Sequence, residues 1–309
     1  MKKAVKLLGN VFMIAALAFI VKKFISMDID PAQFRSPRTI AALAVGFIVQ
    51  TAVIICSCFP WLVFTRALSG RRIPFSAAMP VYTQSNLYKY IPGNVFQYVG
   101  RNKLAADMDI SHVDVAFATL LDIFFCVLWT GLAALVLLGG RIASILSEYG
   151  GKLLIVGGAG VLVLAVLVLI VRLKFRDKLA AYLSRYAEAL RRSDRKMIAK
   201  GAFYYLGQNI VSAAAYFACL ALIVGMSEGA GELVALTGAF MFAWIIGFVT
   251  PGAPGGIGIR EGVMIFVCGD RFAEKVILFV LVMRIGSILA DITAFIIGKI
   301  CEPKRQEEK

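Results

Sequence analysis

Two stretches of this chain share one spacing: Pro92-Gly93-Asn94-Val95-Phe96-Gln97-Tyr98-Val99-Gly100-Arg101 and Pro251-Gly252-Ala253-Pro254-Gly255-Gly256-Ile257-Gly258-Ile259-Arg260. Each is a Pro-Gly pair, seven residues and an arginine within apolar sequence. Proline and glycine interrupt helices, and lipid cannot satisfy the polar backbone groups that a break exposes. Such a break survives only where protein or a wet cavity covers it. The sequence therefore predicts two matched, covered helix breaks, formed by Pro92, Gly93, Pro251, Gly252, Pro254, Gly255 and Gly256.

The composition is that of an all-α polytopic membrane protein. Of 309 residues 60% are hydrophobic and 17% charged, and several apolar runs reach 20 residues. The six cysteines mostly lie in apolar runs without paired spacing, which favours buried small hydrophobic residues over disulfides. With a single histidine and no Cys-His cluster, we expect no metal site and no cofactor.

Six stretches are long enough to cross a bilayer, at about 4–25, 39–65, 111–138, 151–173, 199–226 and 275–299. Two further segments, 74–108 and 233–268, read as helix, break and helix. Each of their arms is too short for a comfortable crossing, so we expect both to be re-entrant hairpins. The expected fold is about six full spans plus two re-entrant broken-helix hairpins.

Basic residues predict the orientation of the spans. There are four main clusters: one precedes the span 4–25, one follows the span 39–65, one lies in the connection 172–200, and one lies in the carboxyl-terminal tail. All four clusters fall on one side of the membrane if the first hairpin returns to the face from which it enters. Because basic residues mark the cytoplasmic side, this orientation puts both termini in the cytoplasm. The expected location is the plasma membrane. Lys22, Lys23, Arg35 and Arg38 oppose this orientation. Much of the net charge of +14 therefore lies beside the spans, where it can attract anionic lipid, and we expect no nucleic-acid partner.

This orientation relates the two hairpins by inversion. The chain becomes a single transmembrane domain, 1–309, with repeats at about 39–138 and 199–299 and a connector span at 151–173. Matched breaks in inverted repeats typically mark a transport site near the midplane. The segment 174–197 has apolar residues at helical spacing with Lys and Arg between. It is expected to lie on the cytoplasmic membrane surface, with a solvated connecting helix as the alternative.

Arg101 and Arg260 are the leading candidates for binding an anion. A guanidinium offers a planar fork of donors to a phosphate, and the half-helix after each break directs free N–H groups towards the same place. The alternatives are that Arg101 extends to the membrane interface and that Arg260 pairs with Glu261. The second copy is so rich in glycine that its helix should start late and leave Arg260 near the cavity.

Other polar residues lie near the first break. Lys89, Asn94 and Gln97, with nearby tyrosines, fit a sugar–phosphate head group, although tyrosines also mark ordinary membrane interfaces. The charges within apolar runs are Asp122, Arg284 and Asp291. Such charges are costly in lipid and usually face the bundle interior. Structural ion pairs and coupling of transport to protons both remain open for them.

The two motifs, with Lys89-Tyr90-Ile91 before the first and Glu261 after the second, resemble the transmembrane region of lysylphosphatidylglycerol synthases. That region also occurs alone in flippase-like membrane proteins, and the resemblance covers nearly the whole chain. It implies movement of a lipid with a modified head group, either an aminoacyl-phospholipid or an isoprenoid-linked sugar. Stand-alone members often occur beside glycosyltransferases. The chain ends at Lys309 without an aminoacyl-transfer domain, so we expect it not to make lysyl lipid by itself.

The leading expectation is a lipid flippase-like transporter that is not an enzyme. Its partner would be an anionic or isoprenoid-linked membrane lipid, with a glycosyltransferase or lipid-modifying enzyme as a second candidate partner. Two other functions remain open. One is a membrane-embedded transferase, or the membrane subunit of a glycosyltransferase. The other is a scaffold that recruits a partner through the basic 174–197 helix.

Overall fold

The computed structural model describes residues 31–91, 95–139, 141–142, 147, 176–250, 256, 258–268 and 272–302, and this part of the chain is helical, without strands. The predicted spans at 4–25 and 151–173 lie outside the described residues. So do seven of the residues predicted to form the helix breaks or the site: Pro92, Gly93, Asn94, Pro251, Gly252, Pro254 and Gly255. The structure leaves those predictions untested.

Four long helices match four predicted spans: α3 (Pro37–Ser69), α6 (His112–Leu138), α9 (Arg195–Ile223) and α12 (Ala273–Ile300). A fifth helix, α10 (Ala230–Val249), is also long and apolar enough to cross a membrane. With these five helices, the chain is a multi-pass membrane protein. The prediction that both arms of 233–268 are too short is wrong for α10, because its 20 residues extend about 30 Å.

The other arms are short, as the sequence predicts. The first hairpin contains α4 (Phe75–Leu87), a 3₁₀ turn η1 (Tyr88–Tyr90) and α5 (Phe96–Ala105). The second continues from α10 to α11 (Ile259–Cys268). Short elements α2 (Pro31–Phe34), η2 (Ala106–Met108) and η3 (Met226–Glu228) precede α3, α6 and α10. In each hairpin the two arms pack against each other.

Local sequence explains where the long helices begin and end. The Ser111 side chain accepts a hydrogen bond from the Val113 N–H at the start of α6, and Asp194 does the same for Lys196 at the start of α9. Gly70 ends α3 in the left-handed conformation, with φ of 68°. These caps satisfy backbone groups that would otherwise be left unpaired at helix ends.

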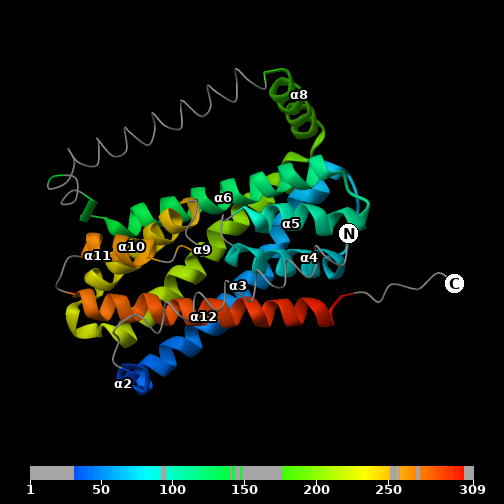
Figure 1. The fold of residues 1–309 in the computed structure, drawn as a ribbon. Coiled ribbons are helices and arrows are strands. Elements are labelled where there is room, and N and C mark those ends of the chain that lie inside the picture. Colours follow the sequence, from blue (N-terminus) through cyan, green and yellow to red (C-terminus); the bar gives the residue numbers. More distant parts are fainter. Residues whose placement is uncertain are drawn as a thin grey trace.

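The helix packing repeats itself within the bundle. In the first half α3 packs on α4 and α6, and α5 packs on α4 and α6. In the second half α9 packs on α10 and α12, and α11 packs on α10 and α12. Contacts between the halves correspond too, because α4 packs on α12 just as α10 packs on α6, while α3 and α9 cross each other. Figure 1 shows the α4–α5 and α10–α11 hairpins at opposite ends of the bundle.

Glycines allow the closest crossings between the two halves. Gly46 of α3 and Gly286 of α12 lie against each other, and Gly298 of α12 lies against Thr83 of α4. Gly238 of α10 lies against the backbone of α6. Close backbone approach at small residues is the usual means by which membrane helices associate, since lipid gives little hydrophobic drive between them.

The basic segment forms α8 (Arg176–Arg192), which ends before Asp194 caps α9. The helix predicted at 174–197 therefore extends beyond the carboxyl end of α8 in the structure. In Figure 1 α8 stands at the edge of the bundle. Tyr186 lies 4.3 Å from Phe117 between ring centres, and Leu190 packs on the core. Burial raises the pKa of Tyr186 above its ordinary value. These two residues face the protein, whereas the prediction gave the apolar face of this helix to lipid.

We expect Gly238→Ala to lower the stability of the protein by about 1–3 kcal/mol, the usual cost of overpacking. An added Cβ would lie 2.6 Å from the Leu138 backbone nitrogen, and backbone cannot rotate away. Thermal unfolding in detergent measures the change. Gly207→Ala on α9 is the matched control, because nothing lies within 4 Å of its added Cβ. Equal loss in both variants would contradict this close crossing.

Candidate functional site

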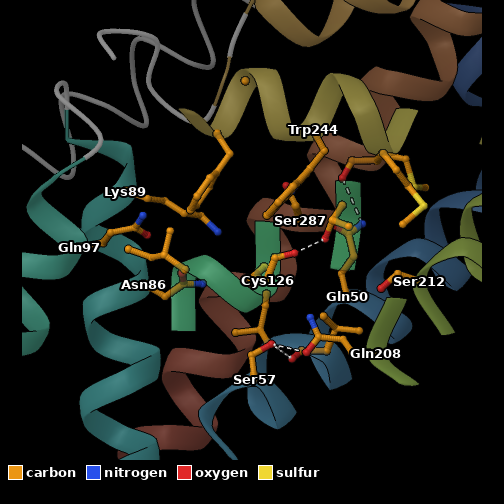
Figure 2. Close-up of a pocket in the computed structure, with 18 of the residues that line it drawn as sticks. Gln50, Ser57, Asn86, Lys89, Gln97, Cys126, Gln208, Ser212, Trp244 and Ser287 are labelled. Carbon is orange, nitrogen blue, oxygen red and sulfur yellow. Dashed lines mark hydrogen bonds between the residues drawn. The ribbon is translucent and has the colours of Figure 1, made fainter. Parts of the chain in front are cut away.

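A cavity of about 240 Å³ lies where the two hairpins meet the long helices. Residues from α3, α4, α5, α6, α9, α10, α11 and α12 line it. In Figure 2, Lys89, Asn86 and Gln97 lie on one side and Gln50, Gln208 and Ser212 on the other, with Trp244 and Ser287 between them. The lining combines polar, aromatic and aliphatic side chains, and the helices that carry the polar ones are mostly apolar. Such convergence of polar side chains is typical of a ligand site.

Arg101 is held within the bundle by an ion pair. Its Nη1 lies 3.0 Å from Asp122 Oδ2, and its Nε donates to Ser85 Oγ at 3.2 Å. The guanidinium carbon lies 3.9 Å from the centre of the Tyr82 ring and 5.6 Å from that of Trp61. The side chain is only 3% exposed. Arg101 therefore does not extend to the membrane interface, and the ion-pair alternative for Asp122 is confirmed.

Asp122 is fully engaged by this cluster. Its Oδ1 accepts a hydrogen bond from the Tyr205 hydroxyl, and its Oδ2 accepts from Arg101 and, at 3.5 Å, from Tyr82. A buried carboxylate needs such partners, because burying a charge alone costs far more than burying a satisfied one. Asp122 on α6 thus fixes helix α5 through Arg101 and helix α9 through Tyr205.

The second hairpin carries a similar ion pair with the charges exchanged. Glu261 of α11 lies against Arg284 of α12, with Oε1 2.7 Å from Nε and Oε2 accepting from Nη2 at 3.1 Å. Arg284 Nη2 also donates to the Gly256 carbonyl at 2.7 Å. Glu261 Oε2 accepts from the Gly258 N–H at 2.9 Å, so this carboxylate already occupies part of the α11 amino end. The alternative that pairs Arg260 with Glu261 is wrong, because Glu261 binds Arg284.

The third ion pair joins the two halves of the chain. Asp291 of α12 lies 2.7 Å from Lys89 Nζ and accepts hydrogen bonds from Asn86 at 2.7 Å and Tyr90 at 2.6 Å. Its side chain is fully buried, whereas that of Lys89 is 25% exposed and lines the cavity. An ion pair with arginine was one expectation for Asp291. Its cation is instead a lysine from the first hairpin.

Arg260 differs from the other cavity cations. Lys89, Arg101 and Arg284 each form an ion pair with a carboxylate, whereas Arg260 forms none within the part of the chain that the structure describes, and its buried Nε makes no hydrogen bond there. Its guanidinium carbon lies 5.9 Å from the centre of the Trp244 ring. Two glycines leave it room: a Cβ on Gly247 would lie 2.9 Å from Arg260 Cγ, and one on Gly256 3.0 Å from its Nε. Helix α11 begins at Ile259, so the prediction that Arg260 would lie near the cavity is confirmed.

The structure brings most of the predicted site residues together. Lys89, Gln97, Arg101 and Arg260 line the cavity, and Glu261 lies just behind Arg284. The prediction that the intramembrane charges face the bundle interior is also confirmed, since Asp122, Arg284 and Asp291 are all buried.

Sequence reasoning missed several lining residues. Gln50, Gln208 and Asn209 lie within predicted spans, where the cost of polar groups in lipid could have singled them out. Gln50 donates to the Met283 carbonyl at 3.2 Å, and Gln208 accepts from Ser57 at 2.9 Å. Tyr205 and Trp244 gave no comparable signal, because aromatic residues are common in such helices.

Comparisons of the chain with protein-family models, curated proteins and solved structures each gave no match.

We expect Arg101→Gln and Asp122→Asn each to destabilise the protein by about 3–5 kcal/mol, because each leaves a buried charge without its partner. The double variant should cost clearly less than the sum of the two. Unfolding free energies in detergent give this coupling.

The exposed Arg71–Asp109 pair, at 2.7 Å with side chains 54% and 88% exposed, is the control. Arg71→Gln should cost under about 1 kcal/mol. Additive losses at Arg101 and Asp122 would mean that the two charges are not coupled.

Proposed function

We propose that this chain is a lipid transporter of the flippase type, which moves a lipid with a phosphate-containing head group between leaflets. The phosphate binds Arg260 in the central cavity while the lipid tails remain in the membrane. The observation that carries the proposal is that Arg260 has no carboxylate partner among the described residues, in a cavity where the other described charges are paired.

The charges of the cavity can be counted from the contacts. Among the described residues four cations line it: Lys89, Arg101, Arg260 and Arg284. Three carboxylates neutralise all but Arg260, namely Asp291, Asp122 and Glu261. The described site thus has one positive charge in excess. A phosphate entering it would replace part of its lost hydration with a fixed cation, which lowers the cost of carrying charge through the membrane core.

Arginine suits this role for two reasons. Its planar guanidinium binds two phosphate oxygens at once, and it stays charged when poorly hydrated. Arg101 is less suited, because its Nη1 and Nε already bind Asp122 and Ser85. The two motif arginines therefore take different roles in the proposal: Arg260 binds the ligand and Arg101 holds helices together.

The packing supports an alternating-access mechanism. The corresponding contacts of the two halves fit inverted repeats, in which one half rocks against the other around a fixed site. In this proposal the α4–α5 hairpin is re-entrant, both termini are cytoplasmic and the membrane is the plasma membrane. The resemblance to the transmembrane region of lysylphosphatidylglycerol synthases agrees with a lipid substrate, either an aminoacyl-phospholipid or an isoprenoid-linked sugar.

We expect Arg260→Gln to slow transbilayer movement of a fluorescent phosphatidylglycerol in liposomes by about tenfold or more, since a charged hydrogen bond contributes about 1.5–3 kcal/mol. The variant should be as stable as the wild type or more so, because it removes an unpaired buried charge. Arg260→Lys keeps the charge without the planar fork, and should be intermediate in rate.

Arg284→Gln is the matched control for this effect. It removes an arginine from the same cavity but leaves Glu261 without its cation, so it should lower stability, unlike Arg260→Gln. Wild-type rates of lipid movement in a folded Arg260→Gln protein would contradict the proposal. A loss of rate that merely follows a loss of stability would assign Arg260 a structural role.

A further inference from the structure

We infer that the cavity selects a phosphodiester lipid whose head group is uncharged and rich in hydroxyl groups, and that it excludes head groups carrying a free amine. This inference rests on the proposed function, because it concerns the same site. It separates the two substrate classes that the function leaves open: it favours a sugar or polyol head group over an aminoacyl one.

The carboxylates of the site are the first reason to expect that an amine is excluded. An ammonium group in a buried cavity needs an anionic partner, since an unpaired charge is costly there. The three carboxylates are already neutralised, because each forms an ion pair with a cation of the chain and each of their six oxygens has a donor or a cation beside it. The donors to Asp122 are Tyr205, Tyr82 and Arg101, and those to Asp291 are Asn86, Tyr90 and Lys89. Glu261 is held by Arg284 and the Gly258 N–H.

The charge of the phosphate is the second reason to expect a phosphodiester without an amine. A phosphodiester carries one negative charge and matches the single excess charge at Arg260. A phosphomonoester carries about 1.5 to 2 negative charges at neutral pH and would exceed it. A phosphodiester with an amine is neutral overall, so its ammonium group would restore the excess positive charge that the phosphate had removed. A lysyl head group would add still more positive charge.

The remaining polar lining suits hydroxyl groups. Carboxamides both donate and accept hydrogen bonds, and hydroxyl-bearing side chains do the same. The uncharged polar residues that line the cavity include Gln50, Gln97, Gln208, Asn209, Ser212 and Ser287. Figure 2 shows Gln50, Gln208 and Ser212 together on the side of the cavity away from Lys89. Trp244 and Tyr216 add aromatic faces near Arg260, against which the apolar faces of a sugar can pack.

The test uses liposomes containing the full chain and a trace of one lipid that carries the same acyl-chain fluorophore throughout. The probes are phosphatidylglycerol, phosphatidylinositol, phosphatidylethanolamine and lysyl-phosphatidylglycerol, and a membrane-impermeant quencher reports the fraction that has crossed. We expect the first two to cross about tenfold faster than the two amine-bearing lipids, or more, which corresponds to about 1.4 kcal/mol.

The outcomes separate this inference from the proposed function. Equal rates for all four lipids, or faster movement of the amine-bearing ones, would overturn the head-group inference and leave lipid transport intact. Rates no higher than those of protein-free liposomes for every probe would contradict both.

A gain of function tests the inference in the opposite direction. Gln208→Glu places a carboxylate on the cavity wall without a described cation beside it, and Glu can still accept the hydrogen bond from Ser57. It should raise the rate for phosphatidylethanolamine relative to phosphatidylglycerol by about tenfold. Gln208→Met, which has a similar size and no charge, should leave that ratio unchanged. An unchanged ratio in a folded Gln208→Glu protein would overturn the inference.

Discussion

The structure depends on the cost of burying charge in a membrane. An ionised side chain within a span costs about 3 kcal/mol or more, and it persists only with partners. The described part of this chain buries three carboxylates, and each of them joins different helices. Asp122 binds Arg101 and Tyr205, Glu261 binds Arg284, and Asp291 binds Lys89 across the two halves. Glycines then bring the helix backbones close enough for the bundle to pack around these pairs.

The same requirement explains why two similar halves give one asymmetric site. In the first half the motif arginine, Arg101, meets an aspartate on the following long helix. In the second half the following helix presents Arg284 at the corresponding contact, and Glu261 pairs with it. Its neighbour Arg260 is then left without a carboxylate in the described part of the chain. An exchange of charge on one helix thus converts a structural arginine into a candidate ligand-binding one.

Much of this arrangement follows from sequence patterns. Runs of about 20 apolar residues give the long helices, and Pro-Gly pairs locate the ends of the hairpin arms, because both signals act locally. The helix-break signal underestimates the length of α10, because the apolar run before that break is by itself long enough to cross a membrane. Partner choice was not accessible, since Glu261 lies beside Arg260 in sequence but pairs with Arg284, 23 residues further on. Such pairing depends on how helices face each other in space.

The central claim is that the phosphate of a lipid binds Arg260, which has no carboxylate partner in the described part of the chain. Native mass spectrometry of wild-type and Arg260→Gln protein, each released from the same detergent with added phosphatidylglycerol, counts the lipid bound to each chain. The account predicts one lipid retained by the wild type at concentrations where Arg260→Gln retains almost none, with both proteins folded. Equal occupancy in the two proteins across the same lipid concentrations would contradict it.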